Sequence, residues 1–330
     1  MRRLLSCIMA AGLLSSPGAQ AQDVVVRVSP DAPRTPVSDD LFPTVQMALD
    51  HAPQPGPGGR LTIQIAPGIY HERVIITQNR PRTTLQGMGS RPQDVVITAA
   101  ENAKSAGGTF FSSTVEAYGA EFEADNLTFQ NAAGATGQAV ALTVRSDRAV
   151  LKHCRILGDQ DTLFADFGRQ YYVDDYVEGG VDFIFGDAAA VFADSEIHII
   201  RPGYLTAQSR TQPDQATGYV FLRDRITAAD MGDRTFFLGR PWRSYARVVF
   251  LDTEMPASLS PQGWTAWTRA GSIAGTFYAE RGSTGPGARS NSRLAGSYQL
   301  SAAQAARFLP ARFLAGSDHW DPLAAAARLP

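Results

Sequence analysis

The stretch QDTLFADFGRQYYVDDYVEGGVDFIFG, residues 160–186, places two aspartates in apolar surroundings. Asp161 lies in QDTLF and Asp182 lies in VDFIF, and each is followed by residues that are expected to pack in a core. The other acidic residues of the stretch form an ordinary polar run, Asp174, Asp175 and Glu178. Because burying an unpaired carboxylate costs free energy, we expect the two embedded aspartates to have a specific role.

Outward from this stretch, the chain from Leu61 to about Thr268 consists of short β-type runs such as LTIQIA, NLTFQN and RVVFLD, separated by Gly, Asn and Asp. Between Thr128 and His198 similar polar-to-apolar strand openings recur at intervals in the twenties, with no helical segment between them. Such a period without helices is typical of a parallel β-helix, a solenoid in which each coil stacks on the one before. We therefore predict an all-β fold.

The same spacing predicts where polar side chains meet. Gln138, Gln160 and Asp182 are separated by 22 residues each. In stacked coils of that period they form a row on neighbouring strands roughly 4.8 Å apart, with Asp161 beside it. Adjacent residues of a regular strand face opposite sides, so we expect a bulge or a strand end at Gln160 and Asp161.

A solenoid needs cover at its ends, because an open coil exposes core residues and unpaired strand edges. A helix is predicted around Pro43 to His51, followed by a Pro/Gly-rich terminator, and it is expected to cap one end. The amphipathic tail LSAAQAARFLPARFLAGSDHW, residues 300–320, is expected to provide a second cap.

The N-terminal residues 1–21 have the features of a secretory signal peptide: Arg2 and Arg3, a short apolar run, and a small-residue cleavage site ending at Ala21. The run is too short to span a bilayer. Lipidation of Cys7 is the weaker alternative. We expect residues 22–330 to form one domain that is secreted or periplasmic and monomeric.

Composition excludes several partners. Without Arg2 and Arg3, 28 basic residues face 32 acidic ones, so the net charge is −4, which favours neither nucleic acid nor an anionic membrane. After cleavage Cys154 is the one remaining cysteine, so no internal disulfide is expected, and its place in VLKHCRIL predicts a buried strand position. No G-x-S-x-G, no G-x-G-x-x-G and no His/Cys cluster is present, which leaves carboxylate and amide chemistry.

Four sequence blocks carry a family resemblance: QAVAL (138–142), GDQDTLF (158–164), GGVDFIFG (179–186) and LGRPW (238–242). In order and spacing they resemble the signature blocks of pectin methylesterases. Three further blocks match the same family: PGIYHERV, GTFFSSTV and DNLTFQNAAG. The resemblance runs from about Phe42 to Trp320. It implies a right-handed parallel β-helix of a bacterial secreted type, acting on methyl-esterified polygalacturonate without metal or organic cofactor.

Carried over position by position, the resemblance implies that Asp182 is the nucleophile and that Asp161 is the general acid, which later acts as a base. It implies that Gln138 and Gln160 stabilise the oxyanion and that Arg240 orients the nucleophile. The residues expected to contact the substrate are Thr109, Gln138, Phe164, Phe185, Arg240 and Trp242. Phe164 replaces the family's commoner Tyr, so one polar contact to the sugar is in doubt.

The chemistry fits these residue types. A carboxylate that attacks a methyl ester gives an acyl-enzyme anhydride and divides the hydrolysis into two steps. Asp182 must be ionised, and an adjacent Arg240 is expected to lower its pKa. Asp161 must be protonated to supply methanol with its proton, and burial beside a second carboxylate raises such a pKa. Neutral amide donors stabilise the oxyanion without competing for protons.

Other interpretations stay open. The scaffold is also compatible with a noncatalytic glycan-binding β-helix, an esterase or thioesterase of another acyl substrate, or a glycan-cleaving enzyme with paired carboxylates. Trp264 and Trp267 are equally compatible with a groove wall and with core packing. The segment 223–225 is interpreted as a solvated charge cluster, and Tyr70 and Glu72 as a structural pair or a groove edge.

Overall fold

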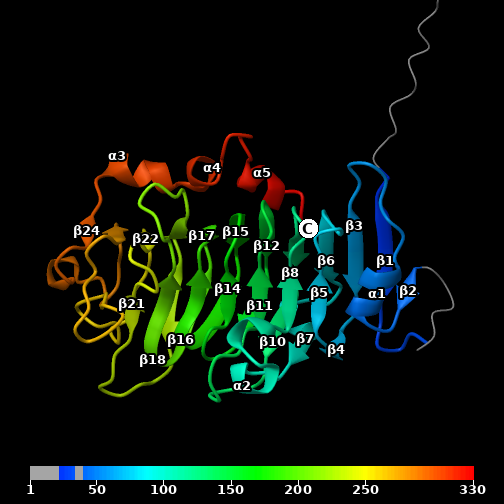
Figure 1. Ribbon diagram of the computed structural model, residues 1–330, viewed down its shortest axis with the longest axis horizontal. Coiled ribbons are helices and arrows are strands. Elements are labelled where there is room, and N and C mark those ends of the chain that lie inside the picture. The colour runs from blue at the N-terminus through cyan, green and yellow to red at the C-terminus, as the bar shows by residue number, and fades with distance from the viewer. Residues whose placement is uncertain (1–21, 34–39) are drawn as a thin grey trace, which may run out of the picture.

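The structure, a computed structural model, describes residues 22–33 and 40–330. The predicted signal peptide and Cys7 lie outside these described residues. Figure 1 shows strands side by side along the long axis, and every strand pair in the described part of the chain is parallel. The predicted parallel β-helix is confirmed.

One long sheet, sheet A, forms the first face of the solenoid. In spatial order its strands are β2 (Leu41–Phe42), β1 (Val24–Val28), β3 (Leu61–Ile65), β6 (Thr83–Gly87), β9 (Glu123–Asp125), β12 (Ala149–Lys152), β15 (Arg169–Val173), β17 (Ala189–Ala193), β19 (Gly218–Leu222), β22 (Arg247–Leu251), β23 (Phe277–Arg281) and β24 (Tyr298–Gln299). From β3 to β23 each coil contributes one strand, so residues 20 to 39 positions apart become neighbours in this part of the sheet.

Two further faces share the long strands β16 (Tyr176–Gly186) and β18 (Glu196–Gln208). On one side lie β4 (Gly68–His71), β7 (Val95–Ala99), β10 (Thr128–Asn131), β13 (Arg155–Leu157) and β20 (Arg225–Ala228). On the other lie β5 (Val74–Ile76), β8 (Val115–Ala117), β11 (Leu142–Val144), β14 (Leu163–Ala165) and β21 (Phe237–Gly239). The second group carries the candidate site.

Stacked side chains fill the inside of the solenoid. Phe192, Phe221 and Phe250 come from successive strands of sheet A, and their ring centroids lie 4.8 and 4.5 Å apart. All three are fully buried. Because equivalent positions of parallel coils lie directly above one another, one aromatic position per coil produces this ladder.

One corner of the coil repeats a left-handed backbone conformation, with φ between 52° and 57°. Its residues are Asn126, His153, Asp174, Asp194, Arg223 and Asp252. Asn and Asp tolerate this conformation better than most side chains. The recurring polar residues before the apolar runs are therefore the turn between two faces, repeated once per coil.

Two acidic residues at this corner are buried, contrary to the sequence prediction. Asp175 accepts a hydrogen bond from the backbone N–H of Cys154 at 2.6 Å, and Asp224 accepts one from Ser195 at 2.8 Å. Burial raises the pKa of both carboxyls well above the usual range. They bind backbone N–H groups of the neighbouring coil, so neither belongs to a solvated polar cluster. Cys154 is buried, as predicted.

Helix α1 (Val45–His51) packs at the β1 end of the solenoid, as predicted, and begins two residues after Pro43. The Thr44 hydroxyl accepts a hydrogen bond from the backbone N–H of Met47. The Glu72 carboxylate accepts bonds from the first two helical N–H groups, at 2.9 Å each. Glu72 thus has the structural role of a helix cap.

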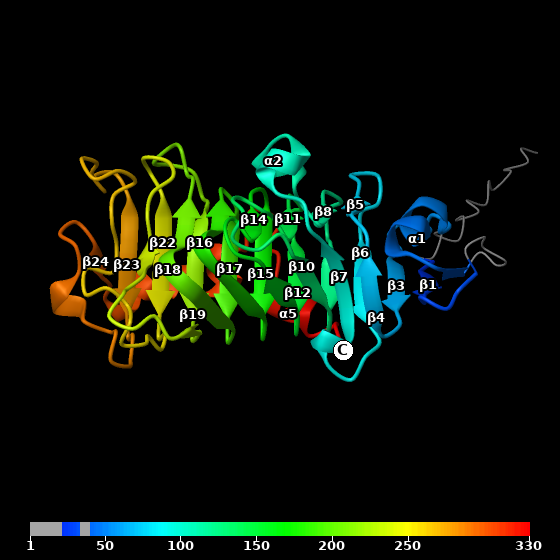
Figure 2. The same cartoon turned by 90° about the horizontal axis from the view of Figure 1, so that it is seen from below.

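The prediction that the C-terminal tail caps the other end is wrong. Its helices α3 (Ala302–Ala305), α4 (Pro310–Phe313) and α5 (Pro322–Ala326), with the 3-10 turn η4 (Ala306–Phe308), run back along the outer surface of sheet A (Figure 1). Figure 2 shows them beside the strands from β23 to β12. The outward-facing positions of these strands are apolar and need cover from water: Val150, Tyr171, Val191, Val220, Val249 and Ala279.

The remaining short helices are α2 (Ala103–Ala106) and the 3-10 turns η1 (Pro92–Asp94), η2 (Thr109–Phe111) and η3 (Ser290–Ser292). α2 and η2 lie in the loop between β7 and β8, on the face that holds the candidate site (Figure 2). Within the described residues, no helix is long and apolar enough to cross a membrane.

Candidate active site

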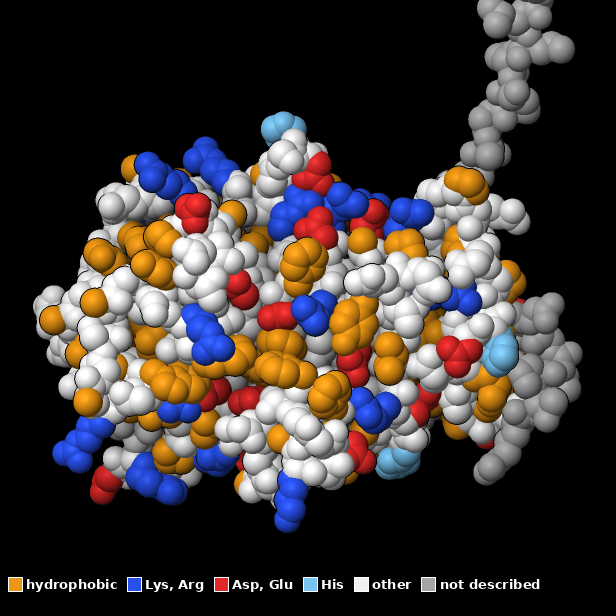
Figure 3. Space-filling model, in the orientation of Figure 1, with side chains coloured by type: hydrophobic (Ala, Val, Ile, Leu, Met, Phe, Trp, Pro, Cys, Tyr) orange, Lys and Arg blue, Asp and Glu red, His pale blue; other side chains and the backbone are white. Residues whose placement is uncertain are grey.

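A hollow of about 350 Å³ brings together most of the predicted site residues. It lies where the segments before β11 and β14 and the second half of β16 meet the loop after β21. Hydrophobic side chains gather on this face of the molecule (Figure 3). The lining residues are Thr109, Phe110, Gln138, Gln160, Asp161, Asp182, Phe185, Ala207, Arg240, Trp242 and Trp267. Of the predicted residues, only Phe164 is absent from this lining.

The predicted row of side chains is wrong by one residue. Gln138 pairs with Gln160, as expected, but Gln160 pairs with Val181 instead of Asp182. Asp161 and Asp182 are both left-handed, with φ of 64° and 51°. The same backbone turn recurs in two successive coils at a spacing of 21 residues, so the two aspartates stand at equivalent positions. The expected irregularity at Gln160 and Asp161 is confirmed as this turn.

Asp182 forms a two-point ion pair with Arg240. Nε and Nη2 of Arg240 donate to the two carboxylate oxygens, at 2.9 and 2.6 Å. The Asp182 side chain is buried. Burial raises the pKa of Asp182, and the hydrogen bonds and charge of Arg240 oppose that shift. Arg240 acts to lower this pKa, as predicted, but the net shift is upward because desolvation outweighs the ion pair; the contact still favours the ionised form.

The guanidinium of Arg240 is held between two aromatic rings. Its central carbon lies 4.0 Å from the ring centroid of Tyr204 and 4.2 Å from that of Trp267. Guanidinium groups stack favourably on aromatic faces. The planar fork is thereby fixed in the orientation that meets both oxygens of Asp182.

Asp161 has no such partner: among the described residues no hydrogen bond reaches its carboxyl group. Burial, and next the charge of Asp182, raise the pKa of Asp161 to about 8, while Arg240 opposes the shift. The two carboxyls therefore differ in one contact, the guanidinium. At neutral pH this arrangement favours a neutral acid at Asp161 beside an ionised Asp182.

The side-chain amides of Gln138 and Gln160 have no hydrogen-bond partner within the described part of the chain, although their backbones are engaged. The Gln160 carbonyl accepts from the N–H of Ala139, and the Gln138 carbonyl accepts from Ala103. An internal amide ladder is therefore not formed. Both amides line the hollow and are available to a ligand.

One wall of the hollow is aromatic. The centroid of Phe164 lies 5.0 Å from that of Phe110 and 4.6 Å from that of Phe185, and Trp242 lies 6.0 Å from Phe185. Phe164 is 6% exposed, so its ring supports the wall from behind. Phe110 is 49% exposed and completes the lining.

Sequence reasoning missed Phe110, Tyr204 and Ala207. Phe110 follows Thr109 in GTFFSSTV, which was the available signal, whereas nothing in the local sequence marks Tyr204. The two tryptophans whose placement the sequence left undecided differ in position. Trp267 is 40% exposed and lines the hollow. Trp264 is fully buried and stacks on Tyr278 at 4.2 Å, so it belongs to the core.

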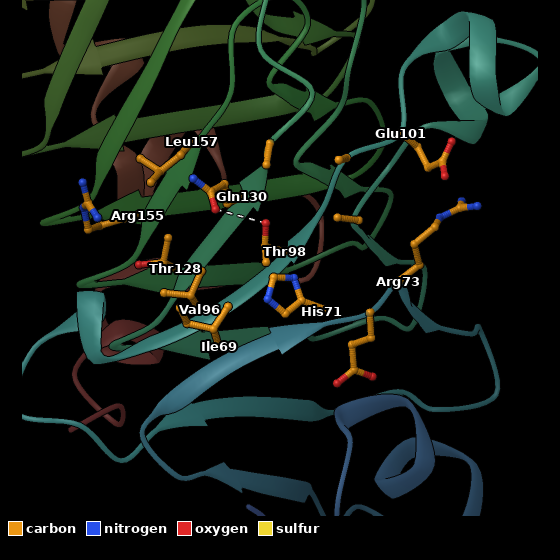
Figure 4. Close-up of a pocket in the computed structure, with 14 residues that line it drawn as sticks. Ile69, His71, Arg73, Val96, Thr98, Glu101, Thr128, Gln130, Arg155 and Leu157 are labelled. Carbon is orange, nitrogen blue, oxygen red and sulfur yellow. Dashed lines mark hydrogen bonds between the residues drawn. The ribbon is translucent and has the colours of Figure 1, made fainter. Parts of the chain in front are cut away.

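A larger hollow of about 710 Å³ lies over β4, β7, β10 and β13 (Figure 4). There Thr98 donates a hydrogen bond to Gln130 at 3.0 Å. Its charged residues already have structural partners: Glu72 caps α1, and Arg73 binds the carbonyl of Ser113 and the carboxylate of Glu116. This hollow holds no equivalent of the paired carboxylates.

Comparison with known proteins agrees with this geometry. The family model described as Pectinesterase matches residues 36–317. The chain belongs to the pectinesterase family. A pectinesterase from Daucus carota is 37% identical over 291 residues, which cover 84% of this chain and 90% of the relative. A solved structure of pectin methylesterase from carrot matches with a TM-score of 0.83 and 33% identity, covering 96% and 98% of the two chains.

Other pectinesterases are similar to the chain at lower identity or over only part of their own length. A solved pectin methylesterase in complex with hexasaccharide VII has 28% identity and a TM-score of 0.73, over 92% of this chain and 99% of that one. The chain spans about half the length of two plant relatives, probable pectinesterase/pectinesterase inhibitor 17 of Arabidopsis thaliana and pectinesterase/pectinesterase inhibitor U1 of Solanum lycopersicum. The assignment to a bacterial secreted type stays a prediction.

Proposed function

We propose that this pectinesterase-family chain hydrolyses the methyl esters of polygalacturonate, releasing methanol and leaving free carboxylates on the polymer. The observation that carries the proposal is the pair Asp161 and Asp182 in one hollow, of which only Asp182 is bound by a guanidinium. The family membership, and a related enzyme solved with a bound hexasaccharide, support a glycan ester as substrate.

In the first step a carboxylate oxygen of Asp182 attacks the ester carbonyl carbon, and the carbonyl electrons move onto oxygen. The amide N–H groups of Gln138 and Gln160 donate hydrogen bonds to this oxyanion. When the tetrahedral intermediate collapses, the bond to the methoxy oxygen breaks and Asp161 gives that oxygen its proton. Methanol leaves, and the sugar remains joined to Asp182 as an anhydride.

In the second step Asp161, now a carboxylate, takes a proton from water as the water attacks the sugar carbonyl. The C–O bond to Asp182 breaks, which releases the sugar carboxylic acid and restores both aspartates to their starting states. Arg240 stabilises the carboxylate of Asp182 whenever it is free. The exposed faces of Trp242 and Phe110 are suited to pack against sugar rings.

The test is methanol release from highly methylated pectin, measured together with new reducing ends. The proposal predicts methanol without new reducing ends, because the glycosidic bonds stay intact. New reducing ends at a comparable rate would instead indicate a glycan-cleaving enzyme, and absence of methanol at every pH would leave only a binding role. A chelator is expected to leave the rate unchanged, since no step requires a metal.

Export is part of the same proposal. We infer that residues 1–21 are a signal peptide and that the mature chain begins at Gln22. Mass spectrometry of protein secreted by a bacterial host is expected to give that N-terminus, and size-exclusion chromatography with light scattering is expected to give a monomer. A lipid-modified mass would indicate anchoring through Cys7 instead.

A further inference from the structure

A second hollow, which we call the tail hollow, lies between the outer surface of sheet A and the C-terminal tail. Its volume is about 440 Å³. β22 and β23 provide its floor, where Arg247 and Phe277 are paired across the strands. It is lined by Ala216, Arg247, Phe277, Leu300, Gln304, Arg307, Phe308, Arg312 and Phe313. None of these residues belongs to the active site.

The tail hollow contains three guanidinium groups and no carboxylate. Within the described residues no ion pair or hydrogen bond engages the side chains of Arg247, Arg307 or Arg312. By contrast, Arg169 of the same sheet binds both Asp147 and Asp318. Figure 3 shows basic and acidic side chains interspersed along this upper edge of the molecule, where the tail helices run, but the charged residues that line the tail hollow are all Arg. The hollow is therefore positive and unneutralised.

The charge of Arg247 is half-buried, which costs free energy when no anion is bound beside it. Burial, and next the charge of Arg210, lower the pKa of Arg247 to about 10. The Arg210 guanidinium binds the backbone carbonyls of Tyr245 and Gln215, and the charges of Asp187 and Asp214 act on Arg210 and not on Arg247. A half-buried cation that lacks a counter-ion is stabilised by any anion that fits beside it.

The other walls are suited to a sugar. The ring centroid of Phe308 lies 5.7 Å from that of Phe277 and 5.8 Å from that of Phe313. Aromatic faces provide contact area for the C–H faces of sugar rings. Guanidinium forks match planar carboxylates with two parallel hydrogen bonds. The ligand that combines these features is a sugar ring that bears a carboxylate.

The tail hollow is also near the active site along the chain. Arg247 follows Trp242, an active-site residue, by five positions, so their Cα atoms are at most about 18 Å apart. We propose that the tail hollow binds the free carboxylates of demethylated polygalacturonate, the product of this enzyme. A methyl ester has no charge, so the hollow distinguishes product from substrate. This inference rests on the proposed function for the identity of the polymer.

The test is calorimetric titration of the full mature chain with unesterified oligogalacturonate at low ionic strength. The wild type is expected to show two binding events. The double variant Arg307→Gln, Arg312→Gln changes exposed side chains and is expected to weaken one event by at least about tenfold. Trp242→Ala is expected to weaken the other event. Arg289→Gln, which removes the same charge from an exposed loop, is expected to keep both.

Arg247→Gln provides a second variant from the floor of the hollow, and it is expected to weaken the same event as the double variant. A single event, lost only in Trp242→Ala, would overturn the inference. So would competition by inorganic phosphate, at equal ionic strength, that matches the oligosaccharide, because the hollow would then be a general anion site. Fully methylated oligomer is expected not to bind there.

Methanol release separates this inference from the proposed function. The double variant is expected to release methanol from short methylated oligomers at the wild-type rate. If the wild type binds oligogalacturonate in the tail hollow but releases no methanol, the proposed function fails and the binding site stands. If methanol is released and the hollow variants bind like wild type, the inference fails alone.

Discussion

Arg240 holds Asp182 by two hydrogen bonds, although the residues are 58 positions apart in the sequence. Asp161, at the equivalent position of the preceding coil, has no such contact. One guanidinium thus gives different environments to two carboxylates that the solenoid places in equivalent positions. The account of catalysis depends on this asymmetry.

Replacing Arg240 with Lys tests the two-point contact. Lys keeps the charge but has no planar fork, so it cannot bind both oxygens of Asp182 in the same plane. We expect kcat/KM to fall by at least about tenfold, which corresponds to the loss of one charge-assisted hydrogen bond. The acid limb of the pH profile is expected to move to higher pH, because the ionised form of Asp182 loses support. An unchanged profile would contradict this role.

Tyr204 tests the aromatic clamp on Arg240. Tyr204→Leu removes one of the two rings, and a stacked cation is worth about 0.5–2 kcal/mol, so we expect kcat to fall by about 2- to 30-fold. Tyr204→Phe keeps the ring and is expected to restore the wild-type rate and pH profile. If both variants behave alike, the hydroxyl or general packing matters, and the clamp does not.

The pH dependence follows from Asp161. Its pKa is raised to about 8, so the group is protonated below that pH and loses its proton above it. The acid form is required to protonate the leaving methanol, and the rate of the first step is therefore expected to fall as pH rises through about 8. Stopped-flow measurement of methanol release in the first turnover checks this limb. Asp161→Asn removes the acid, and recovery of activity at high pH in that variant would refute the assignment.

Gln138 and Gln160 test oxyanion stabilisation. Replacing either with Ala removes a neutral donor that is otherwise without a partner, so the fold is expected to persist. Loss of one such donor typically lowers kcat by about 10²- to 10³-fold. Steady-state kinetics are expected to show this loss in kcat with little change in KM. A change confined to KM would indicate ground-state binding instead.

Much of this architecture follows from the sequence. Periodic polar residues predict the coils, and the quoted blocks bring Asp161, Asp182, Gln138, Gln160 and Arg240 to one hollow. The register between Gln160 and Val181 was not predictable by counting residues, because the spacing changes from 22 residues in one coil to 21 in the next, next to the left-handed Asp161 and Asp182. Counting assumes a regular strand, and the site lies where the strand is irregular.

Burial at the corners and the path of the tail were also beyond local sequence patterns. Asp174 and Asp175 are adjacent and chemically identical, but Asp174 is exposed, whereas Asp175 is buried and binds the backbone of the neighbouring coil. The amphipathic pattern of the tail predicts that it covers an apolar surface, but it does not indicate which surface of the solenoid. The apolar outer positions of sheet A, such as Val220 and Val249, decide that question, and they become visible only once the strands are paired.

The central claim is that Asp182 is the nucleophile, and methanol release from pectin by Asp182→Asn tests it most directly. Asn is tolerated in the left-handed conformation of this residue, so the fold is expected to persist. Asp174→Asn is the matched control, since it makes the same change at an exposed left-handed position. We expect Asp182→Asn to lower the rate by at least about 10³-fold while the control matches wild type. Wild-type release by Asp182→Asn would contradict the account.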